Sequence, residues 1–410
     1  MPSSINLSTH QEAHIEHDAI LEDDIQFLAP LSQHYLAPKA VFLTGATGLL
    51  GVYILDELLR TSSANIYCLV RAIDEEFAQQ RLINHLTSYG LYKEEYFDRI
   101  LPVLGDLTEP FFGLDEHIYN ELAAEIDVVY YSAGWINMLY PYSRLKPANV
   151  LGVKEAIRFA GLNQTKPLHF VSSIAVFFNS ADNTENQILT EADVPAFHAS
   201  LKGGYGKSKW VGDRLVAAAQ ERGLPATIHR PTRIMGHSIT GALNDNSELL
   251  PQLLKGCIKL GYYPTWDIEV TMVPVDYISS TMVHLAASPA NFGKAFHYFN
   301  PHPIRWLDLI ALVNAQGYDL KEITYEQWLA ELKKAIDSPE ESHLEDREFY
   351  SRLLLALKVP HYLFYKRPHF DSKNIAEGIA GTDISCHKID NELISRYIHY
   401  WQKTGFCPKP

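Results

Sequence analysis

Val41-Phe42-Leu43-Thr44-Gly45-Ala46-Thr47-Gly48-Leu49-Leu50-Gly51 is the stretch that decides the fold of this chain. Its start is apolar enough for a buried strand, and the residues after the turn have the spacing of an amphipathic helix. Gly45, Gly48 and Gly51 meet three needs of a dinucleotide site: a tight turn, close approach of the backbone to a pyrophosphate, and close packing of helix on strand. The helix start also offers N–H groups and a positive dipole end to phosphates. The stretch therefore predicts dinucleotide binding.

Short apolar strands and long helices alternate from residue 39 to Arg230. Strands are predicted at Ala40–Thr44, Asn65–Val70, Ile100–Leu104, Val128–Ser132, Leu168–Ser172 and Ala226–Arg230. Helices are predicted at Leu50–Leu59, Glu75–Ser88, Asp115–Ala124, Ser143–Leu162 and Tyr205–Arg222. Such alternation indicates a parallel sheet covered on both faces. The expected fold class is α/β, a Rossmann-type doubly wound parallel sheet with a smaller, mainly helical C-terminal substrate domain.

The alternation breaks down after Arg230, and this sets the expected domain boundaries. Beyond it we expect a loop over 231–246, a helix over Ser247–Leu260, and a strand over Ile268–Val275 that leads into another helix. Residues 300–410 read as mostly helical. We therefore expect a lead-in or linker at 1–38, an NADP-binding Rossmann domain at 39–285 and a substrate domain at 286–410, with part of 231–270 on the substrate side.

Composition narrows the class of protein. A net charge of −14 argues against a nucleic-acid partner, because such proteins need cations to neutralise phosphates. No run approaches the roughly 18 apolar residues of a membrane span, and the N-terminus lacks a signal-peptide pattern, so no membrane partner is expected. The cysteines lie far apart without a CxxC pair, which favours reduced thiols in a cytoplasmic protein over a disulfide framework or a metal site. They are Cys68, Cys257, Cys386 and Cys407.

The end of the second predicted strand bears on the choice of cofactor. Arg71 stands where NAD-binding sites usually carry an acid, and an arginine there suits a 2′-phosphate, so the position favours NADP. Arg81, ten residues later, is either a second cation for that phosphate or a solvated helix residue. Asp74 is a rival ligand for the ribose. Asp106, with Leu107, follows the third strand where a carboxylate can meet the adenine.

A tyrosine and a lysine four residues apart predict the chemical site. Tyr205 and Lys209 lie on the same face of a predicted helix. An adjacent ammonium stabilises a phenolate and lowers the pKa of the phenol from its ordinary value of about 10. Ser173, at the tip of an earlier strand, is the expected hydroxyl partner. Together with the glycine turn, these residues are typical of a short-chain dehydrogenase/reductase.

The chain resembles the terminal thioester reductase domains of nonribosomal peptide and polyketide synthases, relatives of the reductase domains of carboxylic acid reductases and aminoadipate reductases. The likeness runs from about Asp18 to Pro410, and the ordered set of motifs is far more specific than any single one. The motifs are Val41–Gly51, Tyr67–Ala72, Tyr140–Leu145, Ala148–Gly152, Gly203–Asp213, Gly236–Gly241, Leu254–Cys257, Val273–Tyr277, Phe296–Pro301 and Thr404–Pro410.

The resemblance implies NADPH-dependent reduction of an acyl or peptidyl thioester carried on the phosphopantetheine arm of a carrier domain. Hydride adds to the carbonyl carbon, the hemithioacetal expels the thiol, and the aldehyde is released; some members reduce it again to an alcohol. By motif position Tyr205 protonates the oxyanion, Ser173 polarises it, and Lys209 anchors the ribose and tunes Tyr205. The expected cofactor-binding set is Thr44, Gly45, Thr47, Gly48, Leu49, Leu50, Gly51, Arg71, Arg81, Asp106, Leu107, Ser132, Ala133, Gly134, Asn149, Tyr205, Lys209 and Pro231.

One loop departs from the family pattern. The family usually reads Tyr-His-Asn/Ser-Gly-Ala, whereas this chain reads Tyr130-Tyr131-Ser132-Ala133-Gly134. A tyrosine replaces the histidine and the Gly-Ala order is reversed, beside the expected nicotinamide position. The carbonyl environment is therefore expected to differ.

Two alternatives and one question about partners stay open. An extended short-chain reductase acting on a soluble acyl-CoA or other carbonyl would share the sheet and the Tyr–Lys pair. A non-enzymatic NADP sensor would typically lose that pair, which this chain keeps. We assign carrier docking to the substrate domain and expect the chain to be monomeric. Docking would need a basic patch such as Lys255 with Lys259 or Lys366 with Arg367, although a solvated surface is the simpler interpretation of either pair.

Overall fold

The computed structural model describes residues 14–177, 188–197, 201, 203–243, 248–337, 344–358 and 369–410. Contacts divide the chain into two compact units. Unit 1 comprises Met1–Thr232, Ile278–Tyr298 and Pro368–Ile384; unit 2 comprises Arg233–Tyr277, Phe299–Arg367 and Ser385–Pro410.

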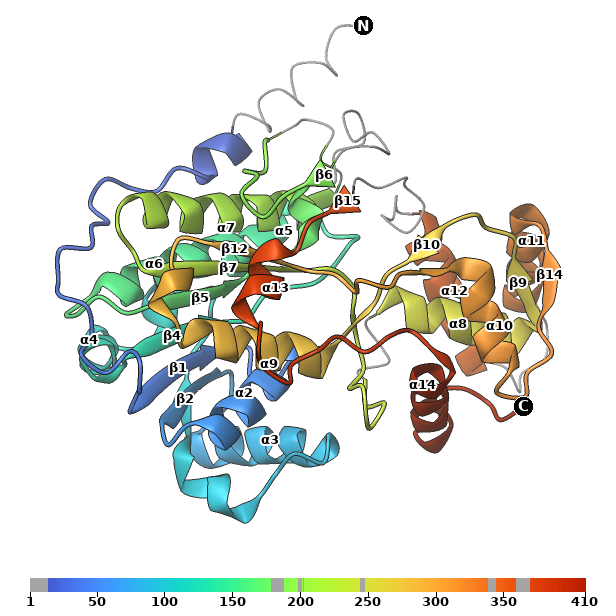
Figure 1. The fold of residues 1–410 in the computed structure, drawn as a ribbon, viewed down its shortest axis with the longest axis horizontal. Coiled ribbons are helices and arrows are strands. Elements are labelled where there is room, and N and C mark those ends of the chain that lie inside the picture. The colour runs from blue at the N-terminus through green and yellow to red at the C-terminus, as the bar shows by residue number, and fades with distance from the viewer. Residues whose placement is uncertain are drawn as a thin grey trace, which may run out of the picture. The chain divides into compact units, whose positions relative to one another are not determined.

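Unit 1 is built on a seven-stranded sheet in the order β12-β7-β5-β4-β1-β2-β3, with every neighbouring pair parallel. Helices α6 and α7 cover one face of this sheet and α2 and α3 the other (Figure 1). The strands are β1 (Ala40–Thr44), β2 (Asn65–Val70), β3 (Ile100–Leu104), β4 (Val128–Tyr131), β5 (Leu168–Val171), β7 (Ala226–Pro231) and β12 (Ala295–Tyr298). The expected doubly wound parallel sheet is confirmed, and the six predicted strands match within one residue.

The connections of unit 1 follow the βαβ pattern. Its helices are α2 (Leu49–Thr61), α3 (Glu75–Ser88), α4 (Glu116–Glu125), α5 (Tyr142–Lys146), α6 (Gly152–Gly161), α7 (Gly203–Glu221), α9 (Val275–Ala286), whose first turn belongs to unit 2, and α13 (Lys373–Gly378). Short helical turns are η1 (Glu94–Arg99), η2 (Pro110–Gly113), η3 (Pro147–Leu151), η4 (Ile174–Phe177) and η5 (Pro289–Asn291). A small sheet pairs β6 (Ile188–Leu189) with β15 (His369–Phe370).

Central strands buried on both faces explain the apolar runs of the sequence. Every residue of β1 is buried, and the ring of Phe42 lies 4.9 Å from that of Phe159 on α6. Phe112 and Tyr119 complete this aromatic cluster, with Tyr119 5.2 Å from Phe159. The cluster packs α4 and α6 against the sheet.

Unit 2 is mainly helical. Its helices are α8 (Leu249–Leu260), α10 (Trp306–Asn314), α11 (Tyr325–Ile336), α12 (Leu344–Lys358) and α14 (Asn391–Lys403). Its strands form pairs: β8 (Ile234–Met235) with β11 (Val273–Pro274), β9 (Tyr262–Pro264) with β14 (Lys321–Ile323), and β10 (Glu269–Val270) with β13 (Ile304–Arg305). Buried tryptophans on α10, α11 and α14 give this unit its core. The single strand expected over Ile268–Val275 is two short strands with different partners.

The lead-in packs on unit 1 from Ile15 onward. Ile15, Leu21 and Ile25 are buried, and a row of acidic side chains meets basic side chains of α5 and α6. The ion pairs are Asp18 with Lys146 at 2.7 Å, Glu22 with Lys154 at 2.8 Å and Asp24 with Arg158 at 2.9 Å. This segment is therefore an ordered part of unit 1.

Candidate active site

The glycine turn follows β1 and packs against the residues that follow β4. Gly45 has a φ of +82°, and a Cβ there would lie 2.8 Å from the backbone nitrogen of Ala133. That same nitrogen donates to Thr44 Oγ1 at 3.2 Å. A Cβ on Gly51 would lie 1.9 Å from the carbonyl oxygen of Gly45, so only glycine lets α2 pack onto the turn. Each of these positions thus has a steric reason for its residue.

The start of α2 is suited to an anion. Gly48 is its N-cap, in extended conformation, and no side chain of the described residues caps this end. The backbone N–H groups of the first turn are then available to phosphate oxygens. Thr47, Leu49 and Leu50 flank the cap as predicted. These residues fit the pyrophosphate of a dinucleotide.

Two arginines lie beside this turn. Arg71 directly follows β2, is 69% exposed, and places Nη1 3.7 Å from Asp106 Oδ2. Arg81, on α3, donates from Nη1 to the carbonyl oxygen of Arg71 at 2.7 Å. Asp74, the rival ribose ligand, accepts from Phe77 N at 2.7 Å as the N-cap of α3. Arg81 therefore contacts the backbone of Arg71, whereas Asp74 caps α3.

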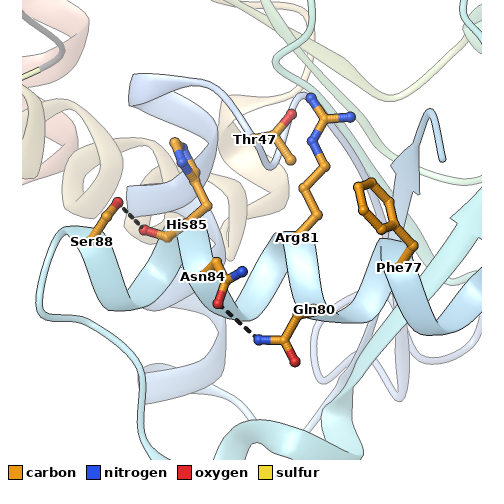
Figure 2. Close-up of a pocket in the computed structure, with 7 residues that line it drawn as sticks. All are labelled: Thr47, Phe77, Gln80, Arg81, Asn84, His85 and Ser88. Atoms are coloured by element: carbon orange, nitrogen blue, oxygen red, sulfur yellow. Dashed lines mark hydrogen bonds between the residues drawn. The ribbon is translucent and has the colours of Figure 1, made fainter.

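A cavity of about 380 Å³ opens next to Arg81. Figure 2 shows the guanidinium of Arg81 beside Thr47, with His85 one helical turn further along α3. The cavity is lined by Thr47, Phe77, Gln80, Arg81, Asn84, His85 and Ser88. A compact anion such as a 2′-phosphate fits a cavity with an arginine and hydroxyl groups on its wall.

The turn after β3 is held by its own hydrogen bonds. Asp106 N donates to Phe112 O at 2.7 Å, and Asp106 Oδ1 accepts from Thr108 N at 2.9 Å and Thr108 Oγ1 at 2.8 Å. Leu107 follows at the same edge of the sheet. The turn holds the carboxylate of Asp106 beside Arg71.

The loop after β4 is tied to helix α7 through Asn149. Asn149 Oδ1 accepts from Trp135 N at 2.6 Å, while its Nδ2 donates to Trp135 O at 3.0 Å and to Ser208 Oγ at 2.9 Å. A Cβ on Gly134 would lie 3.1 Å from Lys209 Nζ, so the loop Ser132–Gly134 passes directly over the lysine. The predicted loop residues and Lys209 are thus neighbours.

Tyr131, the residue that departs from the family pattern, faces the core. It is buried, and its hydroxyl donates to Ala148 O at 3.1 Å in the π-helical turn η3. Gly152 makes room for that hydroxyl, since a Cβ there would lie 2.7 Å from it. The substitution is accommodated on the α6 side of the sheet.

The predicted catalytic residues lie around the end of β5. Tyr205 packs with Leu145 and Ala175, and Ala175 N donates to Ser173 Oγ at 3.2 Å. Lys209 is buried, and its Nζ donates to Val171 O at 3.0 Å, two residues before Ser173. Burial lowers the pKa of Lys209 to about 8, with an opposing contribution from Asp213. Pro231 ends β7 at the same edge of the sheet.

Sequence reasoning missed a buried polar chain behind this site. Asp213, on α7, accepts from Ser172 Oγ and forms a two-point ion pair with Arg230 on β7. The signal was present, because Asp213 continues the spacing of Tyr205 and Lys209 by another four residues.

The basic pairs considered for carrier docking are partly accounted for. Lys255 Nζ lies 4.8 Å from the ring of Phe349 and 4.4 Å from that of Phe406, and Lys259 pairs with Asp346. Lys366 and Arg367 lie outside the described residues.

Within the part of the chain that the structure describes, no group of His, Cys, Asp and Glu side chains is arranged to hold a metal ion. None of the described helices combines the length and the hydropathy of a membrane span.

Comparison with known proteins identifies the family. The family model described as male sterility protein, an NAD-binding family, matches residues 43–282. The chain belongs to this family. It is therefore an NAD(P)-binding oxidoreductase with a Rossmann-type sheet, as expected.

Two solved structures resemble the chain over almost all of its length. The terminal R domain from the myxalamid PKS-NRPS biosynthetic pathway has a TM-score of 0.90 and 37% identity, covering 98% of this chain and 100% of that one. The reductase domain of a nonribosomal peptide synthetase from Mycobacterium tuberculosis has a TM-score of 0.78 and 25% identity, covering 96% and 99%.

Two relatives with assigned names are much longer than this chain. A linear gramicidin synthase from Brevibacillus parabrevis is 36% identical over 90% of the chain, which spans 7% of that protein. The L-2-aminoadipate reductase large subunit of Penicillium chrysogenum is 32% identical over 90% of the chain, which spans 28% of it.

Proposed function

We propose that this protein uses NADPH to release an acyl or peptidyl chain reductively from the phosphopantetheine thioester of a carrier domain. The product is an aldehyde, or an alcohol after a second reduction. The observation that carries the proposal is the position of Lys209 on α7, one helical turn after Tyr205. Its side chain is buried, and its Nζ donates to the carbonyl oxygen of Val171 at the end of β5. The chain's similarity to parts of multidomain synthases and of an aminoadipate reductase supports the proposed thioester substrate and carrier partner.

The cofactor would be held along the carboxyl edge of the sheet. The turn Gly45–Gly51 and the start of α2 would bind the pyrophosphate, and Arg71 with Arg81 the 2′-phosphate. Asp106 and Leu107 would contact the adenine, and the loop Ser132–Gly134 with Asn149 and Pro231 would line the nicotinamide end. NADPH supplies a hydride when it is bound.

The protein's own residues manage the proton and the charge. Tyr205 donates its phenolic proton to the oxyanion that develops at the thioester carbonyl, and Ser173 donates a second hydrogen bond to that oxygen. Lys209 holds a positive charge next to Tyr205, which lowers the cost of the phenolate left behind. The hemithioacetal then loses its hydroxyl proton and expels the thiolate, which takes up a proton, so that the products are the aldehyde and the free thiol.

The test is NADPH oxidation with an acyl-pantetheine and an acyl-carrier thioester, with the product identified by mass spectrometry. Tyr205→Phe should reduce kcat by about 10²–10⁴-fold, the usual contribution of a general acid. Tyr92→Phe removes a surface phenol whose hydroxyl donates to nearby Glu94, and should leave turnover unchanged. Turnover retained by Tyr205→Phe, or activity confined to a soluble aldehyde or acyl-CoA, would contradict the proposal.

A further inference from the structure

Helix α7 presents a third functional side chain in line with Tyr205 and Lys209. Asp213 lies at the next i+4 position, so the three residues share one face of the helix. Asp213 is completely buried, and Lys209 is nearly so. Buried carboxylates are costly unless they are paired, so the contacts of Asp213 indicate what holds it there.

Two residues from neighbouring strands satisfy this carboxylate. Arg230 donates to it from Nε at 2.9 Å and from Nη2 at 2.8 Å, and its side chain is only 4% exposed. Ser172, the last residue before Ser173, donates from Oγ at 2.6 Å. Such a two-point guanidinium contact fixes both the charge and the orientation of the carboxylate.

Arg230 is itself held from behind. Its Nη1 donates to His297 Nε2 at 3.2 Å, and its guanidinium lies 5.0 Å from the ring of Phe177. His297 Nδ1 lies 3.1 Å from Asp371 O, so the histidine serves as a neutral acceptor for the arginine. The guanidinium therefore cannot turn away from Asp213 without losing several partners.

Lys209 needs such a counter-charge. Its ammonium is buried, with Val171 O as a hydrogen-bond acceptor at 3.0 Å and the ring of Phe170 at 5.6 Å. Burial favours the neutral amine and lowers the pKa of Lys209 to about 8, while Asp213 acts in the opposite direction. Among the described residues, the titratable or charged groups around this ion pair include Tyr205 and Asp213 on α7, Arg230 on β7, His297 on β12, and Asp193, whose carbonyl oxygen lies 3.4 Å from Arg230 Nη1.

We propose that Asp213 is a positioning residue of the reductase: fixed by Arg230, it holds a negative charge one helical turn from Lys209 and keeps that lysine protonated for proton transfer by Tyr205. Asp213 touches neither substrate nor cofactor in this scheme. The inference rests on the proposed chemistry of Tyr205 and Lys209. It assigns the buried ion pair a part in setting the pH range of the enzyme.

The experiment compares pH profiles. Asp213→Asn alone leaves Arg230 buried and unpaired, so the informative variant is the double replacement Asp213→Asn with Arg230→Gln, which removes both charges and leaves neutral polar side chains. In this variant the alkaline limb of kcat should move down by about one pH unit, because Lys209 loses its nearest counter-charge. The pH above which NADPH affinity falls, measured by fluorescence without substrate, should move in the same direction.

Ser172→Ala is the matched control. It removes the hydrogen bond from Ser172 to Asp213 and leaves the charge of Asp213 in place. The alkaline limb of kcat and the pH above which NADPH affinity falls should therefore both stay where they are. Unmoved limbs in the folded double variant would overturn the inference, as would an equal shift in Ser172→Ala, which would mean that Asp213 acts through the position of Ser173. If the proposed function itself fails, Tyr205→Phe retains turnover, an outcome distinct from either of these.

Discussion

At the scale of single residues, Tyr131 and Gly152 behave as a pair. The tyrosine hydroxyl occupies the space that a side chain at 152 would need, and Leu107 O lies on another side at 2.9 Å from a Cβ there. The tyrosine that replaces the family's histidine therefore depends on a glycine at the start of α6.

Gly152→Ala should lower the free energy of unfolding by about 1–3 kcal/mol, because the new methyl group overpacks a filled site. Adding Tyr131→Phe should recover part of this loss by removing the hydroxyl. Gly206→Ala is the control: a Cβ there meets only ordinary contacts at 3.7 Å, and an alanine in a helix should add about 0.5–1 kcal/mol. Chemical denaturation measures all three, and equal stability of Gly152→Ala and wild type would refute the pairing.

Residue patterns predicted the glycine turn, because it depends on short-range geometry after a strand, whereas they left Arg81 open between a second cation and a solvated helix residue. They could not reveal the partners of Asp213. Ser172 directly follows β5 and Arg230 lies on β7, and only the pairing of these two strands in the sheet brings the two residues together. Asp74, which directly precedes the predicted helix Glu75–Ser88, is the N-cap of α3.

At the scale of elements, the region predicted as one helix over Ser143–Leu162 is three consecutive segments: α5, the π-helical η3 and α6. Pro147 begins the π-helical turn, since it cannot donate a helical hydrogen bond. The insertion turns Asn149 toward the loop after β4. The edge strand β12 was not predicted, because four residues between a loop and a proline-rich stretch carry little periodic signal.

The lead-in offers a prediction at this scale. Asp18 accepts from both Tyr142 and Lys146 on α5, whose Leu145 packs against Tyr205, and Glu22 pairs with Lys154. Asp18→Asn with Glu22→Gln should lower stability by about 1 kcal/mol at low salt and by less at 1 M salt, since partly exposed pairs are screened.

Thermal unfolding at two salt concentrations checks this expectation. The control is Glu377→Gln, which removes an exposed pair with Lys373 within α13 and should have little effect at either concentration. Equal destabilisation by the double variant at low and high salt would show that the acidic row does not act through charge.

At the scale of the whole molecule, unit 1 carries an acid-sensitive core. His169, Thr227, His229 and Tyr298 form a buried hydrogen-bonded chain across β5, β7 and β12. Burial lowers the pKa of His169 to about 3 and that of His229 well below its ordinary value. Burial, together with Arg230, lowers the pKa of His297 to about 3.

These histidines should make unit 1 less stable in acid. The unfolded chain takes up their protons near pH 6.5 while the folded chain does not, so stability falls as pH drops from about 6.5 toward 3. Glu191 opposes this at first, because burial raises its pKa to about 7 and the folded state then binds more protons between about pH 4.5 and 7. The decline should therefore steepen below about pH 4.5.

Urea unfolding across this pH range tests the expectation. His169→Gln should reduce the slope of stability against pH between about pH 4.5 and 3, since it removes one of the buried histidines that the folded chain leaves unprotonated. An unchanged slope would show that His169 contributes nothing to the acid response.

The return of the chain to unit 1 has a consequence for how the protein is made. Glu191 accepts from His297 N at 2.8 Å and also from Asn374 N, in a helix that follows most of unit 2 in sequence. During synthesis the last strand of the large sheet leaves the ribosome on the order of ten seconds before α13 does, at typical elongation rates. During that interval Glu191 has only one of these two hydrogen-bond donors, so the packing around its carboxylate is completed late in translation. A chain released early at residue 368 would keep every catalytic residue but lack the contact from α13.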